Sequence, residues 1–319
     1  MTVQQPGISF RRRPLLLALA LAIVFVIAAL WGARYVYDQA RYQPVSVANF
    51  PAPAADSPAC ATMVAQAPTE LDEFVQVPLV DPAPAGVVAW VKDSTQRIVS
   101  RCGVDLPAQY DRLSKVLTVD DVDWILVVDT TPGVDLASFY TINTAATIAV
   151  TGPRAALTES VLHDFTALAD PLKTSRATPA AAPLAELPMA ASADTAVCSR
   201  SLEAFSTVLA DDEDYVPATT DQLEGAGFDP ATTRAWIATG YEPVVVRCGV
   251  ENSANYAPTA ILDQVDSVPF FTDTTLAQGT TSAVYYPQGT RQQFAISAPQ
   301  QIAQPVLVTI AGLITSRDL

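Results

Sequence analysis

The chain has 319 residues, half of them hydrophobic, which is long enough for two ordinary domains. Beyond residue 42 it carries 13 basic and 32 acidic side chains, a net charge of −19. This charge argues against binding of nucleic acid, or of anionic lipid head groups, through a basic patch. It favours a soluble surface whose negative charge keeps neighbouring molecules apart. The alternative is that the charge attracts a cationic partner or metal ion.

An uncharged apolar segment occupies residues 14–33, directly after three consecutive arginines. About 20 apolar residues suffice to cross a bilayer, and flanking arginines favour the cytoplasmic side. The alternative is a cleaved signal peptide, but its apolar core usually has only about 7–15 residues and ends at a small-x-small site. We therefore expect a cytoplasmic N-terminus (1–13), a transmembrane signal anchor (14–33) and a single-pass cell-membrane protein whose remainder is extracytoplasmic.

Two proline-containing segments without strand periodicity divide the rest of the chain. Residues 34–58 predict an extended, proline-rich stalk, because proline disfavours helix and favours extended chain. Residues 170–195 predict an Ala/Pro-rich linker. The two candidate domains are then residues 59–169 and 196–319.

These candidate domains are related by duplication. Residues 89–110 and 235–256 are identical at nine of 22 positions at a constant offset of 146, including Trp90 with Trp236 and the string RCGV in both. Solenoid repeats have periods of about 20–50 residues, so an offset of this length indicates a tandem duplication of one domain.

Each copy predicts the same order of elements. A short helix at the first cysteine precedes a hairpin whose second strand ends at the second cysteine; two further strands and an amphipathic helix follow. The fold class is therefore α+β: an antiparallel sheet with flanking helices on one face. The predicted strands are 87–91, 98–102, 123–129 and 147–151, then 235–238, 244–248, 268–273 and 293–297, and Pro305 is placed in the first turn of the last helix.

The four cysteines are distributed two to each copy. Outside the membrane, an even count favours disulfides, and four cysteines allow three pairings. Because each copy of a duplicated domain should be self-sufficient, we expect Cys60–Cys102 and Cys198–Cys248. Zinc and thioredoxin-like chemistry are disfavoured because no C-x-x-C pair is present.

The sequence contains no recognisable catalytic motif: no G-x-S-x-G elbow, P-loop or H-E-x-x-H string. The single histidine, His163, has valine as its counterpart in the second copy, which favours a solvated helix position. The run VDDVDW offers Asp120, Asp121 and Asp123 as weak metal candidates, but it lacks the EF-hand pattern. We expect neither a metal nor a cofactor.

Two residue types in the duplicated hairpin are candidates for binding. Trp90 and Trp236 are either core aromatics packed near the disulfide or exposed platforms that stack on a glycan. Strand alternation places Arg101 and Arg247 on the face opposite the neighbouring cysteine. There they can grip a carboxylate or phosphate bidentately, or form an ordinary surface ion pair.

The strings AWIATGYEPVVVRCGV, ADSPAC and VDDVDW resemble an actinobacterial family of membrane-anchored or secreted proteins catalogued as a domain of unknown function. Its pattern, A-W-G-x-P…L-R-C-G-V, is matched at residues 89–90, 101–104, 235–236 and 247–250. The chain departs from it by lacking the glycine after each tryptophan and by carrying two copies. The resemblance implies an actinobacterial cell envelope, but it supplies no activity.

We therefore expect a membrane-tethered, non-catalytic module that binds or scaffolds an envelope protein or a cell-wall component. The alternative is an enzyme that processes envelope glycans or lipids with carboxylates such as Asp121 and Asp123, which would require paired carboxylates in a cleft.

Overall fold

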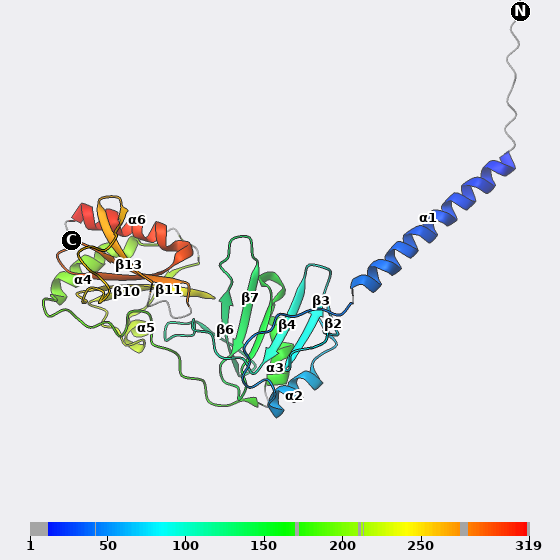
Figure 1. Ribbon diagram of the computed structural model, residues 1–319, viewed down its shortest axis with the longest axis horizontal. Helices are drawn as coiled ribbons and strands as arrows, with labels where there is room; N and C mark the ends of the chain where they lie inside the picture. Colours follow the sequence, from blue (N-terminus) through cyan, green and yellow to red (C-terminus); the bar gives the residue numbers. More distant parts are fainter. Residues whose placement is uncertain are drawn as a thin grey trace, which may run out of the picture.

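The computed structural model describes residues 12–41, 43–169, 172–209, 212, 214–274 and 280–317. Helix α1 (Arg12–Arg41) projects from the remainder of the molecule (Figure 1). Its segment Leu16–Val36 is long and apolar enough to cross a membrane, and none of it is buried in the protein. The helix continues through residues 34–41, where we had placed the start of an extended stalk, because the first helix-breaking residue beyond the apolar segment is Pro44.

The first copy is built on an eight-stranded sheet in the order β1-β2-β3-β4-β8-β7-β6-β5, with every neighbouring pair antiparallel. Helix α2 (Pro58–Gln66) precedes the sheet and α3 (Glu159–Ala169) follows it. The strands are β1 (Glu70–Leu71), β2 (Phe74–Val77), β3 (Val87–Val91), β4 (Arg97–Cys102), β5 (Val116–Val119), β6 (Val122–Val128), β7 (Leu136–Thr141) and β8 (Ile148–Pro153).

The second copy repeats this topology in a seven-stranded antiparallel sheet, β9-β10-β11-β15-β14-β13-β12. Its helices are α4 (Thr195–Ala204), α5 (Thr220–Gly225) and α6 (Gln300–Arg317). The strands are β9 (Val216–Pro217), β10 (Thr233–Ala238), β11 (Tyr241–Cys248), β12 (Asp263–Val265), β13 (Val268–Asp273), β14 (Ser282–Pro287) and β15 (Phe294–Pro299). The predicted fold class, with two homologous antiparallel-sheet units and flanking helices, is confirmed.

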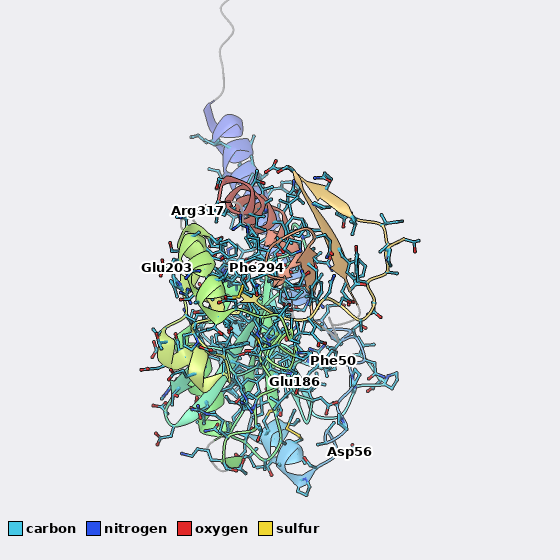
Figure 2. All side chains as sticks on the ribbon, turned by 90° about the vertical axis from the view of Figure 1, so that its left-hand side faces the viewer. Phe50, Asp56, Glu186, Glu203, Phe294 and Arg317 are labelled. Carbon is cyan, nitrogen blue, oxygen red and sulfur yellow. A yellow bond between two sulfur atoms is a disulfide. The ribbon has the colours of Figure 1, made fainter. Side chains whose placement is uncertain are left out.

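Each hydrophobic core lies between one face of the sheet and the first and last helices of its copy. In the first core, Met63 of α2 and Phe165 of α3 pack with Trp90 of β3. The second core is built in the same way from α4, α6 and residues such as Phe294 of β15. Figure 2 marks Phe294 amid the packed side chains and Glu203 on α4. The opposite face of each sheet, here called the open face, is the face on which the motif arginines lie.

The last helix of the second copy corrects one expectation. It begins at Gln300, so Pro305 lies inside α6 and not in its first turn. The hydrophobic positions from Val306 onward predicted the buried face of the helix. They did not predict where the helix begins, because residues 300–304 are mostly polar and show no helical spacing of apolar residues.

Two segments without regular secondary structure lie along the sheets. Strap 1 is residues 43–57, and strap 2 is residues 172–194. In strap 1, the amide of Val45 donates to the carbonyl of Pro78, in the β2–β3 connection, at 3.0 Å. In strap 2, the amide of Ala177 donates to Ile142 of the first copy at 2.7 Å, and that of Ala190 donates to Gly249 of the second copy at 2.8 Å. Both segments are therefore packed against the domains that we had expected them merely to connect.

The two copies also contact each other directly. The amide of Val128, at the end of β6, donates to the carbonyl of Gly240 in the β10–β11 turn at 2.8 Å. Arg154 donates to the Tyr241 hydroxyl at 2.9 Å. Leu113 of the first copy packs with strap 2 residues and β10–β11 on the open face of the second sheet. Figure 1 shows β6 and β11 at this junction.

Candidate functional site

The duplicated string RCGV ends β4 and β11, and its glycines form the crossing points of the two straps. Gly103 and Gly249 have positive φ angles of 81° and 76°, which L-residues rarely adopt. The carbonyl of Gly103 accepts from Ala54 of strap 1 at 3.0 Å, as that of Gly249 accepts from Ala190 of strap 2. A Cβ atom on Gly103 would lie 2.3 Å from the carbonyl carbon of Ala54. Glycine is therefore needed both for the turn and for the close approach of the strap.

The cysteines form the two expected disulfides, Cys60–Cys102 and Cys198–Cys248. Each joins the first helix of its copy to the end of the second hairpin strand, and all four residues are fully buried. The disulfides show which face of the sheet each motif residue occupies. Because the cysteine enters the helix-covered core, the arginine beside it points to the open face.

The structure corrects the assignment of Trp90 and Trp236 as binding residues. They are 0% and 2% exposed. The indole of Trp90 donates to the carbonyl of Pro68 at 2.7 Å and meets the ring of Phe165 edge-on. Both tryptophans lie in the helix-covered cores, where no glycan can reach them.

Arg247 is likewise not free to bind a ligand. This corrects the prediction that Arg247, like Arg101, is a candidate for binding a carboxylate or phosphate. It is 8% exposed, and its Nη1 donates to the carbonyls of Leu184 and Leu187 in strap 2 at 2.7 and 2.8 Å. Its guanidinium also lies 6.0 Å from the ring of Phe228. In the second copy the motif arginine therefore fastens the chain's own strap to the open face.

Arg101, its counterpart, has a different environment. Strap 1 crosses the same face, and it presents the ring of Phe50 to the guanidinium, 6.0 Å away. The buried Nε of Arg101 has no acceptor within the described part of the chain, and neither has the Nε of Arg247, so the difference lies in the Nη atoms, of which only those of Arg247 donate to strap 2. Burial lowers the pKa of Arg101 from its ordinary value, since desolvation penalises the charged form.

A cavity of about 390 Å³ opens beside Arg101, and we call it the open-face cavity. Its floor is β4, whose alternation places Arg97, Val99 and Arg101 on one face, and one of its walls is strap 1 at residues 46–48. Hydroxyls from Thr95 and other residues complete the lining, and none of the described residues that line it is a carboxylate. Two cationic side chains therefore share a cavity with a carboxylate-free lining in a protein of net charge −15.

The corresponding place in the second copy has different chemistry. At the offset of 146, the counterpart of Arg97 is Pro243, and Arg247 is already bonded to strap 2. The sequence identified Arg101 but did not single out Arg97. Arg97 could have been found from its position four residues before Arg101, because strand alternation places both on the same face.

Comparison with protein families gives two matches, one over residues 19–176 and one over 160–317. The chain belongs to the family described as protein of unknown function (DUF3515). Neither a curated protein nor a solved structure matches it. The expected tandem pair of a domain of unknown function is thereby confirmed, and each match to DUF3515 includes the strap that precedes the domain.

The acidic run of the first DUF3515 copy is divided among separate structural roles. Asp120 and Asp121 are the two central residues of the β5–β6 hairpin turn, with φ angles of 46° and 66°, as a type I′ turn requires. Asp120 contacts His163 of α3, and Asp123 pairs with Arg176 of strap 2 at 2.8 Å. Within the residues described, no group of three or more His, Cys, Asp or Glu side chains is arranged to hold a metal ion.

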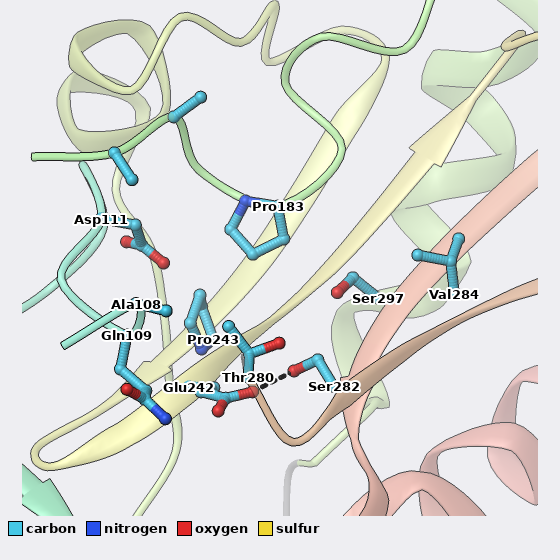
Figure 3. A pocket seen from close by; sticks show the side chains of 12 residues that line it. Ala108, Gln109, Asp111, Pro183, Glu242, Pro243, Thr280, Ser282, Val284 and Ser297 are labelled. Carbon is cyan, nitrogen blue, oxygen red and sulfur yellow. Dashed lines mark hydrogen bonds between the residues drawn. The ribbon is translucent and has the colours of Figure 1, made fainter. Parts of the chain in front are cut away.

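A second cavity, of about 230 Å³, lies where the two DUF3515 copies meet, and we call it the junction cavity (Figure 3). It brings together Asp111 of the first copy and Glu242 of the second, 6% and 7% exposed. Burial, together with the charge of Glu242, raises the pKa of Asp111 to about 6, against opposing hydrogen bonds from Leu113 and Ser114. Glu242 accepts from Thr281 and Ser282 at 2.8 and 2.5 Å.

Sequence reasoning missed this carboxylate pair. The two residues occupy unrelated positions of the repeat, and only the docking of one copy on the other brings them together. No motif or spacing within the chain carries that information.

Proposed function

We propose that the protein is a non-catalytic binding module, tethered to the membrane by α1, that acts on the extracytoplasmic side of an actinobacterial cell envelope. Its ligand is a carboxylate or phosphate group carried by an envelope component, such as an envelope protein or a constituent of the cell wall. One observation carries this proposal: Arg97 and Arg101 line a cavity whose described lining includes no carboxylate. The cell membrane is the only other partner proposed, and nucleic acid is not one.

The location is supported by two independent features. A helix with a candidate span at Leu16–Val36 follows an arginine cluster, which favours a cytoplasmic N-terminus. Two disulfides favour an oxidising compartment for the domains beyond it. The resemblance to actinobacterial proteins supports an actinobacterial cell envelope as the location.

The chemistry of the open-face cavity suits an anion. Guanidinium groups match the planar geometry of carboxylate and the oxygens of phosphate through paired N–H donors. An anion beside Arg101 would offset the desolvation of its half-buried guanidinium, whose Nε has no acceptor in the described chain. The duplicated arginine shows the same capacity, because in the second copy it binds two carbonyl oxygens.

Calorimetric titration of the full chain, in neutral detergent, with inorganic phosphate and with succinate tests this proposal. We expect binding to the wild type that the double variant Arg97→Gln/Arg101→Gln loses by at least about tenfold, or about 1.4 kcal/mol. The matched control is Arg200→Gln, which removes one exposed positive charge from α4 and should leave binding unchanged. Equal binding by wild type and double variant would refute the site.

A second candidate function, processing of an envelope glycan or lipid, is favoured by the junction cavity. Two carboxylates face one cavity, and a pKa near 6 for Asp111 suits a general acid. The carboxylates nominated from the sequence serve elsewhere, since Asp121 is exposed at a turn and Asp123 is paired with Arg176. Turnover of envelope material that Asp111→Asn abolishes, and that the exposed Asp135→Asn retains, would replace binding with catalysis as the function.

A further inference from the structure

Partly exposed apolar side chains lie on the segments that border the open-face cavity. Phe50 of strap 1, which covers Arg101, is 52% exposed. Leu136, which lines the cavity from β7, is 40% exposed, and Val134 beside it in sequence is 37% exposed. Val80, which is bonded to strap 1 at Val45, is 46% exposed. Phe50 at the guanidinium of Arg101, and Leu136 in the cavity lining, therefore offer exposed apolar surface beside the arginines.

Such a combination matches a ligand with an anionic head and an apolar body. A free phosphate or a hydrophilic carboxylate gains nothing from Phe50 or Leu136, whereas burial of apolar area contributes about 25 cal/mol per Å². Exposed apolar residues gathered at one place, and rimmed by polar groups, are typical of sites that bind lipids or other apolar partners.

The chain also limits how far the cavity lies from the membrane. The apolar segment ends at Val36, α1 ends at Arg41, and the cavity wall begins at Ser46. At about 1.5 Å per helical residue and at most about 3.5 Å per extended residue, Ser46 lies within roughly 25 Å of the end of the apolar segment. The tether therefore holds the cavity at a high effective concentration of membrane lipid.

The strongly acidic surface does not oppose this local binding. A net charge of −19 beyond residue 42 keeps the domains from adhering broadly to an anionic bilayer. Charges separated by more than about 8 Å are largely screened at physiological ionic strength, however, so the two arginines dominate inside the cavity. The overall charge thus argues against binding through a basic patch and leaves capture of a single lipid.

Resting on the proposed function, we infer that the anion bound at Arg97 and Arg101 is the head group of an acidic lipid from the membrane that α1 spans. The head group lies between the two guanidinium groups, and the apolar part lies along Phe50 and Leu136. Strap 1 forms one wall of this site, so the bound lipid also contacts the segment that leads directly to the membrane helix.

Native mass spectrometry of the full chain, released from neutral detergent with added lipid, tests this inference. We expect phosphatidylglycerol to be retained at least about tenfold more than phosphatidylcholine by the wild type and by Arg200→Gln. The variant Arg97→Gln/Arg101→Gln should lose the preference. Because α1 itself binds detergent and lipid, only the difference between these variants reports on the cavity.

A second pair of variants distinguishes the contribution of the lipid's apolar part from that of its head group. Leu136→Gln should weaken retention of phosphatidylglycerol while leaving the affinity for inorganic phosphate unchanged. Leu117→Gln, a change to an equally exposed leucine on β5, should alter neither. Glycerol 3-phosphate should bind more weakly than the intact lipid.

The outcomes distinguish this inference from the function on which it rests. If glycerol 3-phosphate binds as tightly as phosphatidylglycerol, or if the two lipids are retained equally while phosphate still binds at the arginines, the lipid inference is wrong and the anion site stands. If neither phosphate nor acidic lipid binding depends on Arg97 and Arg101, both proposals fail.

Discussion

Arg101 and Arg247 occupy the same position of a duplicated motif, yet their surroundings differ. Arg247 is held by two carbonyls of strap 2, whereas Arg101 lines the open-face cavity and has the ring of Phe50 against its guanidinium. The difference originates in the straps, because β4 and β11 present the two arginines in the same way. That difference predicts a stability role for Arg247 and supports the binding role that we propose for Arg101.

Arg247→Gln should lower the free energy of unfolding by about 2–4 kcal/mol, since it leaves one buried and one partly buried carbonyl without a charged donor. Arg101→Gln should change it by less than about 0.5 kcal/mol, because the described structure gives Arg101 no bond to strap 1 like those of Arg247 to strap 2, only the ring of Phe50 at 6.0 Å. Urea unfolding of both variants measures the contrast. Equal losses would mean that strap 1 depends on its arginine as strap 2 does.

Gly103→Ala should destabilise the first copy through two effects, a positive φ angle and contact with strap 1 at Ala54. Gly133 has the same φ angle of +81°, but a Cβ atom added there would have nothing within 4 Å, so Gly133→Ala should cost only the backbone strain of about 1–2 kcal/mol. Thermal unfolding should place Gly103→Ala clearly below Gly133→Ala. Coincident melting temperatures would argue against the close strap crossing.

At the scale of elements, the sequence predicted the parts whose pattern is strong. The hairpins that end in RCGV, the strands equivalent to β6 and β8, and the last helix of the first copy appear where periodicity placed them, whereas the last helix of the second copy begins earlier, at Gln300. It missed β1, β2, β5 and β7 in the first copy and β9, β12 and β14 in the second. Segments such as VLTV and LASFYT lack a clear boundary or alternation, and their pairing with neighbouring strands decides their conformation.

The two disulfides link equivalent elements and close loops of 42 and 50 residues. Replacing both cysteines of either pair with alanine should lower the free energy of unfolding by about 4 kcal/mol, and by similar amounts in the two copies. Alanine is chosen because it buries no new hydroxyl group. Denaturant unfolding with a probe in each copy measures the effect, and a loss below about 1 kcal/mol in either copy would contradict it.

At the scale of the whole molecule, the straps and the junction could not be predicted from the sequence. Low-complexity Ala/Pro segments predict extended chain, but they carry no periodicity that says which surface they contact. The contacts are largely made by backbone groups, such as the amide of Ala177 on Ile142, which almost any sequence can supply. The junction cavity depends in turn on how strap 2 and the β10–β11 turn dock the two copies.

Asp111 at that junction predicts a specific pH dependence. Its folded pKa of about 6 exceeds the ordinary value of 3.8, so the folded state binds the proton more tightly than the unfolded state. Its contribution to stability is therefore fully present below about pH 4 and is lost as the pH rises to about 6, a change on the order of 3 kcal/mol.

Asp111→Asn should remove this slope, which appears as the difference between wild type and variant when unfolding is followed from about pH 4 to about pH 7. Asp135→Asn serves as the control, because that side chain is exposed and does not line the junction cavity. Parallel curves for wild type and Asp111→Asn would show that Asp111 is not buried at the junction.

One motif arginine, Arg247, is bonded to the chain's own strap, and we propose that the other, Arg101, binds an anion. Treatment of the folded full chain with an arginine-selective dicarbonyl reagent, followed by mass spectrometry of the modified sites, tests this difference most directly. We predict modification of Arg97 and Arg101, protection of Arg247, and slowing of the first two by inorganic phosphate while the exposed Arg200 reacts unchanged. Modification of Arg247 as fast as Arg101, or no specific protection by phosphate, would contradict this division of roles.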